Sequence, residues 1–125
     1  MIHGQVNALL QPIVTVRLLG PNGQHLDYDC IVDTGFSGYL MISPMVRNAL
    51  SLPDLGTMAV PVAGGYGVPM GLTEVTVDWH GQRLLVPAHV AYGRPLLGMY
   101  LLRANLLTVE INVNGPLSLQ PLSAP

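Results

Sequence analysis

The sequence has little charge and no lysine. Charged residues make up 10% of its 125 positions, where an average soluble domain has about 25%. Five arginines stand against seven carboxylates, so the net charge is -2, and 50% of the residues are hydrophobic. This balance provides no basic surface for a polyphosphate, so we expect no nucleic-acid partner. A small apolar chain must instead enter a membrane or cover much of its surface with something else.

A long uninterrupted apolar run is also missing. The longest window without a charge, residues 55–73, contains five glycines and two prolines. A membrane-spanning helix needs about 20 mostly apolar residues and would not carry that many helix breakers. The amino terminus has no cationic start before an apolar run, so we predict no secretory signal. The sequence is therefore expected to be cytoplasmic, with no membrane partner.

Cysteine and clustered histidine are scarce. Cys30 is the only cysteine, which excludes an internal disulfide and a cysteine-rich metal site. Its position in an alternating segment favours a buried core thiol. The four histidines are scattered without a ligand spacing, so we expect no metal and no cofactor. Trp79 and the tyrosines other than Tyr66 are expected in the core or at an interface.

The hydrophobic alternation and the turn residues of the sequence predict strands joined by turns. Residues 13–19 and 25–33 alternate in hydrophobicity, and Pro21-Asn22-Gly23 between them favours a reversal. In the second of these strands, Leu26, Tyr28, Cys30 and Val32 share one face. Ser43 followed by Pro44 then predicts the start of a short helix that ends near Leu50.

The second half of the sequence repeats this order. Residues 74–79 and 83–90 alternate around a turn at His80-Gly81, and a helical turn or two is expected over residues 99–103. Strands around Leu107 and Leu117 follow, joined by a reversal at Asn114-Gly115. Each half thus predicts a hairpin, a loop with a glycine and a short helix, with Gly35 matched to Gly98. This order suggests a worn internal duplication.

The chemistry of the sequence concentrates at residues 31–38. Asp33 arrives at the end of an apolar strand and is followed by Thr34 and Gly35. A carboxylate in that position can be held by backbone N–H groups of the following loop. An Asp-Gly pair is also a common turn, so the tripeptide gains its meaning from the glycine-rich segment and the Leu96-Leu97-Gly98 run further along the chain.

With these motifs the sequence resembles the retropepsin-like aspartic proteases, in particular their small single-lobe bacterial and archaeal members. The resemblance covers most of the chain, from about Val14 to Leu122. It rests on the Ile31-Val32-Asp33-Thr34-Gly35 loop, on residues 55–71 in the position of the flap, and on Pro95-Leu96-Leu97-Gly98. It implies an all-β fold for residues 1–125, a closed retropepsin-like β-barrel with one or two short helices and one lobe per chain.

The resemblance also implies roles for individual residues. Asp33 corresponds to the catalytic aspartate, Thr34 to the hydroxyl that braces the loop across a two-fold axis, and Gly35 to the glycine of close approach. The residues expected to contact a peptide or protein substrate come from the loop, the flap tip and the second motif: Phe36, Ser37, Gly64, Gly65, Tyr66 and Leu97.

Amide hydrolysis by water needs a second carboxylate. No other Asp-Thr-Gly or Asp-Ser-Gly occurs, and the region around Leu97-Gly98 carries no acid. The resemblance therefore implies an aspartic endopeptidase that works as a homodimer, with Asp33 of each subunit in one dyad. The apolar terminal strands around Val14 and residues 117–122 are the expected dimer interface.

Two other functions stay open. Phe36 stands where the family usually has a small residue, and Met99 and Tyr100 stand where retroviral members usually have Arg followed by Asp or Asn. These departures leave room for a catalytically silent module for dimerisation or peptide binding. An unrelated small β-barrel that binds an apolar ligand is the third alternative.

Overall fold

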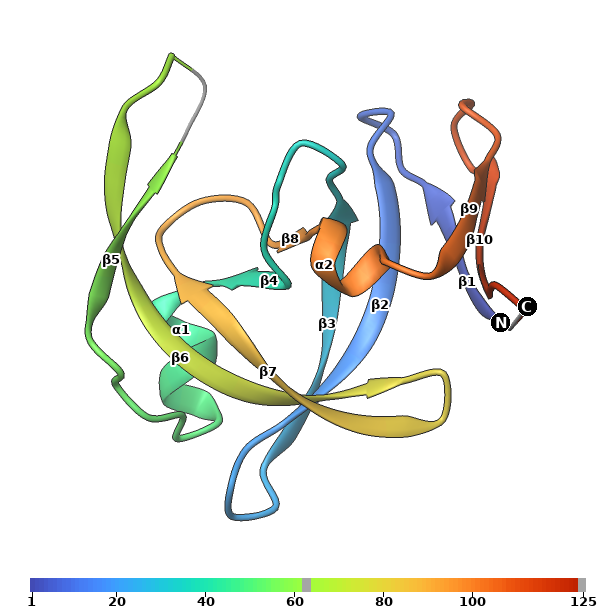
Figure 1. The fold of residues 1–125 in the computed structure, drawn as a ribbon. Coiled ribbons are helices and arrows are strands. Elements are labelled where there is room, and N and C mark those ends of the chain that lie inside the picture. The colour runs from blue at the N-terminus through green and yellow to red at the C-terminus, as the bar shows by residue number, and fades with distance from the viewer. Residues whose placement is uncertain (62–63, 124–125) are drawn as a thin grey trace.

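The computed structural model describes residues 1–61 and 64–123, in which one mixed sheet carries two short helices (Figure 1). The elements in chain order are β1 (Ile2–Val6), β2 (Pro12–Leu19), β3 (His25–Val32), β4 (Leu40–Ile42), α1 (Pro44–Ala49), β5 (Thr57–Pro61), β6 (Gly67–Trp79), β7 (Gln82–Val90), β8 (Leu96–Leu97), α2 (Met99–Leu102), β9 (Asn105–Val109) and β10 (Pro116–Pro121). The predicted all-β class is confirmed.

The sheet closes on itself in its central part. Its strand order is β5-β6-β7-β4-β8-β3-β2-β1-β10-β9, and β6 also pairs with β2. This second pairing joins Leu18 to Val77 and Leu19 to Thr76. Strands β2, β6, β7, β4, β8 and β3 therefore form a closed ring, from which the β5–β6 hairpin and the terminal strands project on opposite sides (Figure 1).

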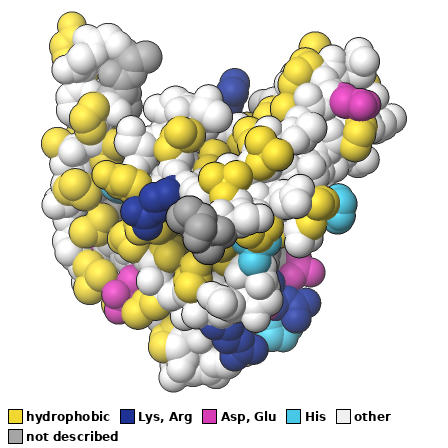
Figure 2. All heavy atoms as spheres, turned by 45° about the vertical axis from the view of Figure 1, so that its right-hand side comes forward, with side chains coloured by type: hydrophobic (Ala, Val, Ile, Leu, Met, Phe, Trp, Pro, Cys, Tyr) yellow, Lys and Arg dark blue, Asp and Glu magenta, His cyan; other side chains and the backbone are white. Residues whose placement is uncertain are grey.

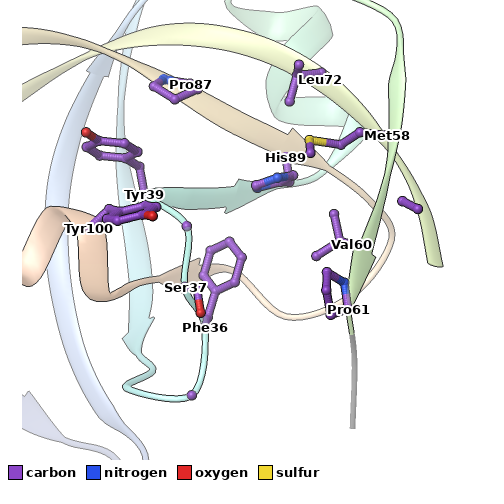
Figure 3. Close-up of a pocket in the computed structure, with 13 residues that line it drawn as sticks. Phe36, Ser37, Tyr39, Met58, Val60, Pro61, Leu72, Pro87, His89 and Tyr100 are labelled. Atoms are coloured by element: carbon purple, nitrogen blue, oxygen red, sulfur yellow. The ribbon is translucent and has the colours of Figure 1, made fainter. Parts of the chain in front are cut away.

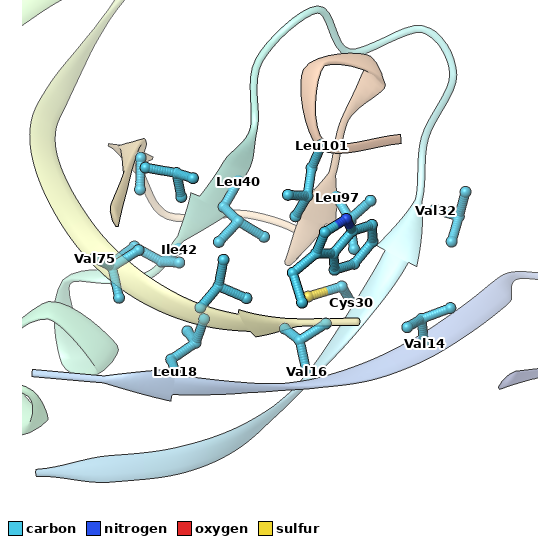
Figure 4. Close-up of a cluster of buried hydrophobic side chains, with 14 of the residues drawn as sticks. Val14, Val16, Leu18, Cys30, Val32, Leu40, Ile42, Val75, Leu97 and Leu101 are labelled. Carbon is cyan, nitrogen blue, oxygen red and sulfur yellow. The ribbon is translucent and has the colours of Figure 1, made fainter. Parts of the chain in front are cut away.

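The core fills this ring, and the alternation of the sequence accounts for it. On β2, Val14, Val16 and Leu18 are buried while the residues between them are more exposed. On β3, Cys30 and Val32 are buried on the face predicted for them. Leu40, Ile42 and Val75 meet these side chains from the other strands of the ring (Figure 4). Each fully buried aliphatic side chain of this kind contributes about 1.5–3 kcal/mol.

Helix α1 (Pro44–Ala49) begins where its sequence predicts. The Ser43 hydroxyl accepts a hydrogen bond from the Val46 N–H at 3.2 Å, and Pro44 occupies the first helical position. Among the helices of the described residues, none is long and apolar enough to cross a membrane.

The two halves of the chain share an order of elements and exchange strands. Parallel pairs join β3 to β8 and β4 to β7, so each half completes the sheet of the other. The residues between β3 and β4 thus correspond to residues 91–95, between β7 and β8. The predicted match of Gly35 with Gly98 is therefore wrong, since Gly98 follows β8 as Ser43 follows β4. Residues 91–95 also contain no acid.

The terminal strands form their own part of the sheet. Strand β10 lies between β1 and β9 and is antiparallel to both. Val14 and Leu117, expected at a dimer interface, are buried inside the single chain instead. The buried faces of these strands cover the chain's own core, whereas Gln120, Pro121 and Leu122 at the end of the expected interface are exposed.

Candidate active site

Asp33 lies directly after β3, at the start of an exposed loop. Its backbone N–H donates to the Leu97 carbonyl at 2.9 Å, which extends the parallel pairing of β3 with β8. Its carboxylate Oδ1 accepts the Gly35 N–H at 2.8 Å, and its carbonyl accepts the Phe36 N–H at 3.2 Å. Three hydrogen bonds therefore fix the backbone and the carboxylate of a half-buried aspartate.

The Leu96-Leu97-Gly98 motif and the residue after it form backbone hydrogen bonds with this loop. Gly98 donates its N–H to the Tyr39 carbonyl at 2.9 Å, and the Met99 N–H donates to the Phe36 carbonyl at 2.8 Å. A Cβ at Gly98 would clash with the carbonyl oxygen of Gly38 and would lie 2.7 Å from that of Phe36. Only glycine allows the chain after β8 to approach the loop this closely.

The other two residues of the motif lie at the tip of the loop. Thr34 and Gly35 are both exposed. A Cβ at Gly35 would lie 3.2 Å from the Asp33 Oδ1, in the space where the carboxylate receives its hydrogen bond. The loop thus presents the hydroxyl residues Thr34 and Ser37 toward solvent, next to the half-buried Asp33 carboxylate.

An apolar cavity of about 440 Å³ opens beside the loop (Figure 3). It begins at Gly35, two residues after Asp33, and its described lining contains no Asp, Glu, Lys or Arg. The lining residues come from the loop, from β5 and from the strands and helix opposite: Gly35, Phe36, Ser37, Gly38, Tyr39, Met58, Ala59, Val60, Pro61, Leu72, Pro87, His89 and Tyr100. The cavity is suited to an apolar side chain.

Two aromatic residues of this wall were expected elsewhere. Tyr39 and Tyr100 lie against each other, with ring centroids 5.5 Å apart, and line the cavity. The Arg103 guanidinium lies 5.9 Å from the centre of the Tyr100 ring and donates to the Tyr39 hydroxyl at 3.5 Å. Only their positions in the sequence could have indicated these two tyrosines as wall residues, because Tyr39 follows the Asp33 loop and Tyr100 follows the Gly98 motif.

His89 is a further wall residue that sequence reasoning missed. Its ring meets that of Phe36 edge to face, with centroids 5.6 Å apart. Burial lowers the pKa of His89 below its ordinary value, because the surroundings disfavour the charged imidazolium. The cavity wall is therefore kept uncharged at neutral pH.

The predicted substrate residues fall into two groups. Phe36 and Ser37 line the cavity, whereas Gly64, Gly65 and Tyr66 lie at the exposed tip of the β5–β6 hairpin and do not reach it. The Tyr66 side chain is 75% exposed. The hairpin contributes to the cavity through β5 instead.

Leu97 lies in the hydrophobic core, not in the cavity wall. Its side chain has no exposed surface, and it packs among the buried residues of the ring. Its contribution to the loop comes from the backbone, through the carbonyl that accepts the Asp33 N–H.

The acids that precede the loop are engaged with β2. Thr15 donates its hydroxyl to Asp29 at 2.6 Å, and Arg17 pairs with Asp27 at 3.1 Å. Within the described residues, no group of three or more His, Cys, Asp and Glu side chains is placed to hold a metal. A single chain thus offers one carboxylate, that of Asp33, beside this cavity.

Cys30 is the buried core residue that the sequence predicts. Burial, together with the neighbouring Asp29, raises the pKa of its thiol to about 12. The reactive thiolate form is therefore nearly absent at neutral pH, which excludes Cys30 as a nucleophile.

The fold is similar to that of retropepsin-like aspartic proteases, as comparison with solved structures shows. The protein from Rickettsia conorii described as a retropepsin-like aspartic protease is 16% identical, with a TM-score of 0.62 over 98% of this chain and 92% of that one. The EIAV protease complexed with the inhibitor HBY-793 is 22% identical, with a TM-score of 0.56 over 74% of this chain and 86% of that one. No protein-family model matches the sequence, and no curated protein sequence matches it either. The predicted resemblance is confirmed for the fold.

Proposed function

We propose that the chain is an aspartic endopeptidase that acts as a homodimer. The observation that carries the proposal is the Asp33 loop, in which hydrogen bonds fix a single carboxylate next to an apolar cavity. The described lining of that cavity holds no acid, so one chain brings only Asp33 to it and has half of a dyad. A second copy, related by a two-fold axis, supplies the other half.

The proposed chemistry follows from two facing carboxylates. Close carboxylates cannot both ionise cheaply, so the pair holds one proton between them. The ionised Asp33 takes a proton from the attacking water, while the protonated Asp33 of the other copy donates to the carbonyl oxygen of the peptide. The tetrahedral intermediate then collapses as the amine leaves with a proton returned by the dyad.

The remaining residues position these groups. The Gly35 N–H orients the Asp33 carboxylate, and Thr34 at the exposed loop tip is placed to meet the other copy. The β5–β6 hairpin serves as the flap, with Gly64, Gly65 and Tyr66 closing over a bound peptide. Phe36 and Ser37 contact a substrate side chain that enters the cavity.

The test replaces the carboxylate with an amide of the same size. Asp33→Asn is expected to lower peptide cleavage at least a thousandfold while leaving a folded protein, because the amide cannot take the proton from water. Cleavage is measured on a peptide library at several pH values by mass spectrometry, and folding is measured by circular dichroism.

Asp54→Asn is a matched control. The Asp54 Oδ1 accepts the Gly56 N–H at 2.9 Å, the same local bond that Asp33 makes with Gly35, but Asp54 is exposed and away from the cavity. This variant is expected to cleave at the wild-type rate. Cleavage retained by Asp33→Asn, or lost equally in both variants, contradicts the proposal.

A non-cleaving peptide-binding module is the second candidate. It is favoured by Phe36, whose buried ring packs with Val60 and Met70 between the loop and the hairpin and lines the cavity. This candidate predicts that the wild type binds library peptides without cleaving them and that Asp33→Asn binds them equally well.

A further inference from the structure

Helix α2 ends at an arginine whose backbone is fixed by several hydrogen bonds. The Arg103 N–H donates to the Met99 carbonyl at 2.9 Å. The side-chain amide of Asn105 donates to the carbonyls of Leu102 and Arg103, at 3.2 and 3.0 Å. Ala104 has a positive φ of 63°, the left-handed conformation that commonly ends a helix. The Arg103 side chain is therefore carried by an ordered part of the backbone.

This side chain lies against one wall of the apolar cavity. Tyr39 and Tyr100, which we call the tyrosine wall, line the cavity on the side opposite to β5 (Figure 3). The Arg103 guanidinium lies 5.9 Å from the centre of the Tyr100 ring, within the range of a cation–π contact, and donates to the Tyr39 hydroxyl at 3.5 Å. Tyr100 is 54% exposed, and Arg103 is exposed as well. The cation thus lies at the rim where the tyrosine wall meets solvent.

Arg103 has hydrogen-bonding capacity for an anion. Both salt bridges within the described residues use other arginines, Arg17 and Arg83. Among the same residues, the Arg103 side chain makes one hydrogen bond, the long one to a tyrosine hydroxyl, whereas a guanidinium has five N–H donors. An arginine with donors to spare binds a carboxylate through two parallel hydrogen bonds.

The charge distribution favours a single carboxylate over a polyanion. Figure 2 shows the basic side chains of one face in small, separate groups among hydrophobic and uncharged side chains. With five arginines, no lysine and a net charge of -2, the chain has too few cations for an extended basic surface. A nucleic acid or another polyphosphate needs several neighbouring cations. The carboxylate of a peptide side chain needs one.

We propose that Arg103 is a specificity-determining residue, which binds an Asp or Glu side chain of the peptide whose apolar side chain fills the cavity. This inference rests on the proposed function and deepens it, because it names the class of substrate: peptides with an apolar and an acidic residue close together in sequence. The apolar subsite lies on one side of the tyrosine wall and the cationic subsite on the other.

The geometry also predicts the spacing of these two substrate residues. An extended peptide advances about 3.3 Å per residue and its side chains alternate between faces, so residues i and i+2 point the same way about 6.6 Å apart. The 5.9 Å between the Arg103 guanidinium and the centre of the Tyr100 ring is close to this spacing. The acidic residue is therefore expected two positions from the apolar one.

The test compares acidic, amide and basic side chains in otherwise identical peptides. Library peptides that the wild type cleaves are synthesised again with Glu, Gln or Lys at each position in turn, and kcat/KM is measured for each. Two positions from the apolar residue, Glu is expected to be favoured over Gln about fivefold, the size of effect that an exposed ion pair gives. This ratio should fall in about 1 M sodium chloride, because salt screens exposed charges.

Variants of Arg103 separate its charge from its packing against the tyrosines. Arg103→Met keeps an apolar stem without the charge, so the ratio of Glu to Gln should fall to about one. Arg103→Lys should keep the preference for Glu, and Arg103→Glu should favour Lys at the same position. Arg83→Glu is the matched control, because it makes the same charge change at an exposed arginine outside the cavity lining, and it should keep the wild-type ratio. Circular dichroism establishes that each variant is folded.

The outcomes distinguish this inference from the proposed function. Equal cleavage with Glu and Gln at every position, or a preference for Glu that persists in Arg103→Met, overturns the role of Arg103 and leaves the endopeptidase proposal standing. If the wild type cleaves no peptide, binding of fluorescein-labelled library peptides with Glu, Gln or Lys is measured by fluorescence anisotropy. A preference for Glu in binding that Arg103→Met removes supports the role of Arg103, and the endopeptidase proposal alone fails. Equal or absent binding of the Glu and Gln peptides overturns that role.

Discussion

His89 places a titratable group in a wall that is otherwise uncharged. Within the described part of the chain, its Nδ1 is buried without a hydrogen-bond partner, and its ring lies against Phe36. Burial lowers the pKa of His89 from 6.5. A proton on this ring would put an imidazolium among apolar side chains, which costs free energy.

This burial predicts how stability depends on pH. Because the pKa of His89 is lower in the folded chain, the unfolded chain binds the proton first as the pH falls below about 6.5. As the pH is lowered from about 6.5 to the pKa of His89 in the folded chain, the free energy of unfolding therefore decreases. The decrease is at most about 1.4 kcal/mol per pH unit for one proton. Urea titrations at pH 7.5 and 5.5 measure the difference.

His89→Gln is expected to reduce that pH dependence, because the amide has no proton to gain in this range. His25→Gln is the control, since the His25 side chain is exposed, and it should leave the dependence as in the wild type. An unchanged slope in His89→Gln would mean that other groups dominate the acid response.

The β5–β6 hairpin contacts the Asp33 loop through the ring of Phe36. Phe36 packs with Val60 and Met70 of the hairpin, together with Met41 of β4. The hairpin lies at the edge of the sheet, where its strand β5 is paired on one side alone within the described residues. Its order therefore depends on this small cluster as well as on its own ladder.

Phe36→Leu is expected to loosen the hairpin without unfolding the chain. The change removes part of a buried aromatic ring and should cost about 1 kcal/mol of stability, with a wider cavity beside the loop. Hydrogen exchange, followed by mass spectrometry, should become faster in β5 and in the paired part of β6. Tyr92→Leu, at a 91% exposed aromatic residue outside the cavity, should leave exchange unchanged. Equal protection in Phe36→Leu contradicts this coupling.

Among the helices and strands, the sequence predicts those whose positions are determined by hydrophobic alternation and by turn or capping residues. The hairpins β2–β3 and β6–β7 and helix α1 appear where the periodicity and Ser43-Pro44 place them. Strand β4 was not predicted, because its three residues are all buried and show no alternation. Strand β1 was missed as well, since its longer pairing is with distant β10, in four residue pairs against two with the neighbouring β2.

The site also has a part that the sequence predicts and a part that it does not. The Asp33 loop was predictable because its motif is local, and its hydrogen bond to Gly35 spans two residues. The cavity was not, because Tyr39, His89 and Tyr100 come together only when β4, β7 and α2 meet. Leu97 was expected to face substrate, but parallel pairing with β3 turns its side chain into the core.

The whole molecule in its proposed active form is a pair of chains. If each dyad takes one Asp33 from each copy, specific activity should fall on dilution once the concentration passes below the dissociation constant of the dimer. The measurement combines initial rates over a range of concentrations with sedimentation of the Asp33→Asn variant, which cannot digest itself. The two curves should have the same midpoint, and constant specific activity across the dissociation measured by sedimentation contradicts a shared site.

The exchange of strands between the two halves has a consequence for synthesis. The Asp33 loop needs the carbonyl of Leu97 and the close approach of Gly98, which lie far along the chain. Contacts of such long sequence separation form late in folding. A chain still emerging from the ribosome therefore has its aspartate but no ordered loop around it. The proposed peptidase is thus inert while it is being made, and it can pair into a competent dimer only after residues 97–98 have been added.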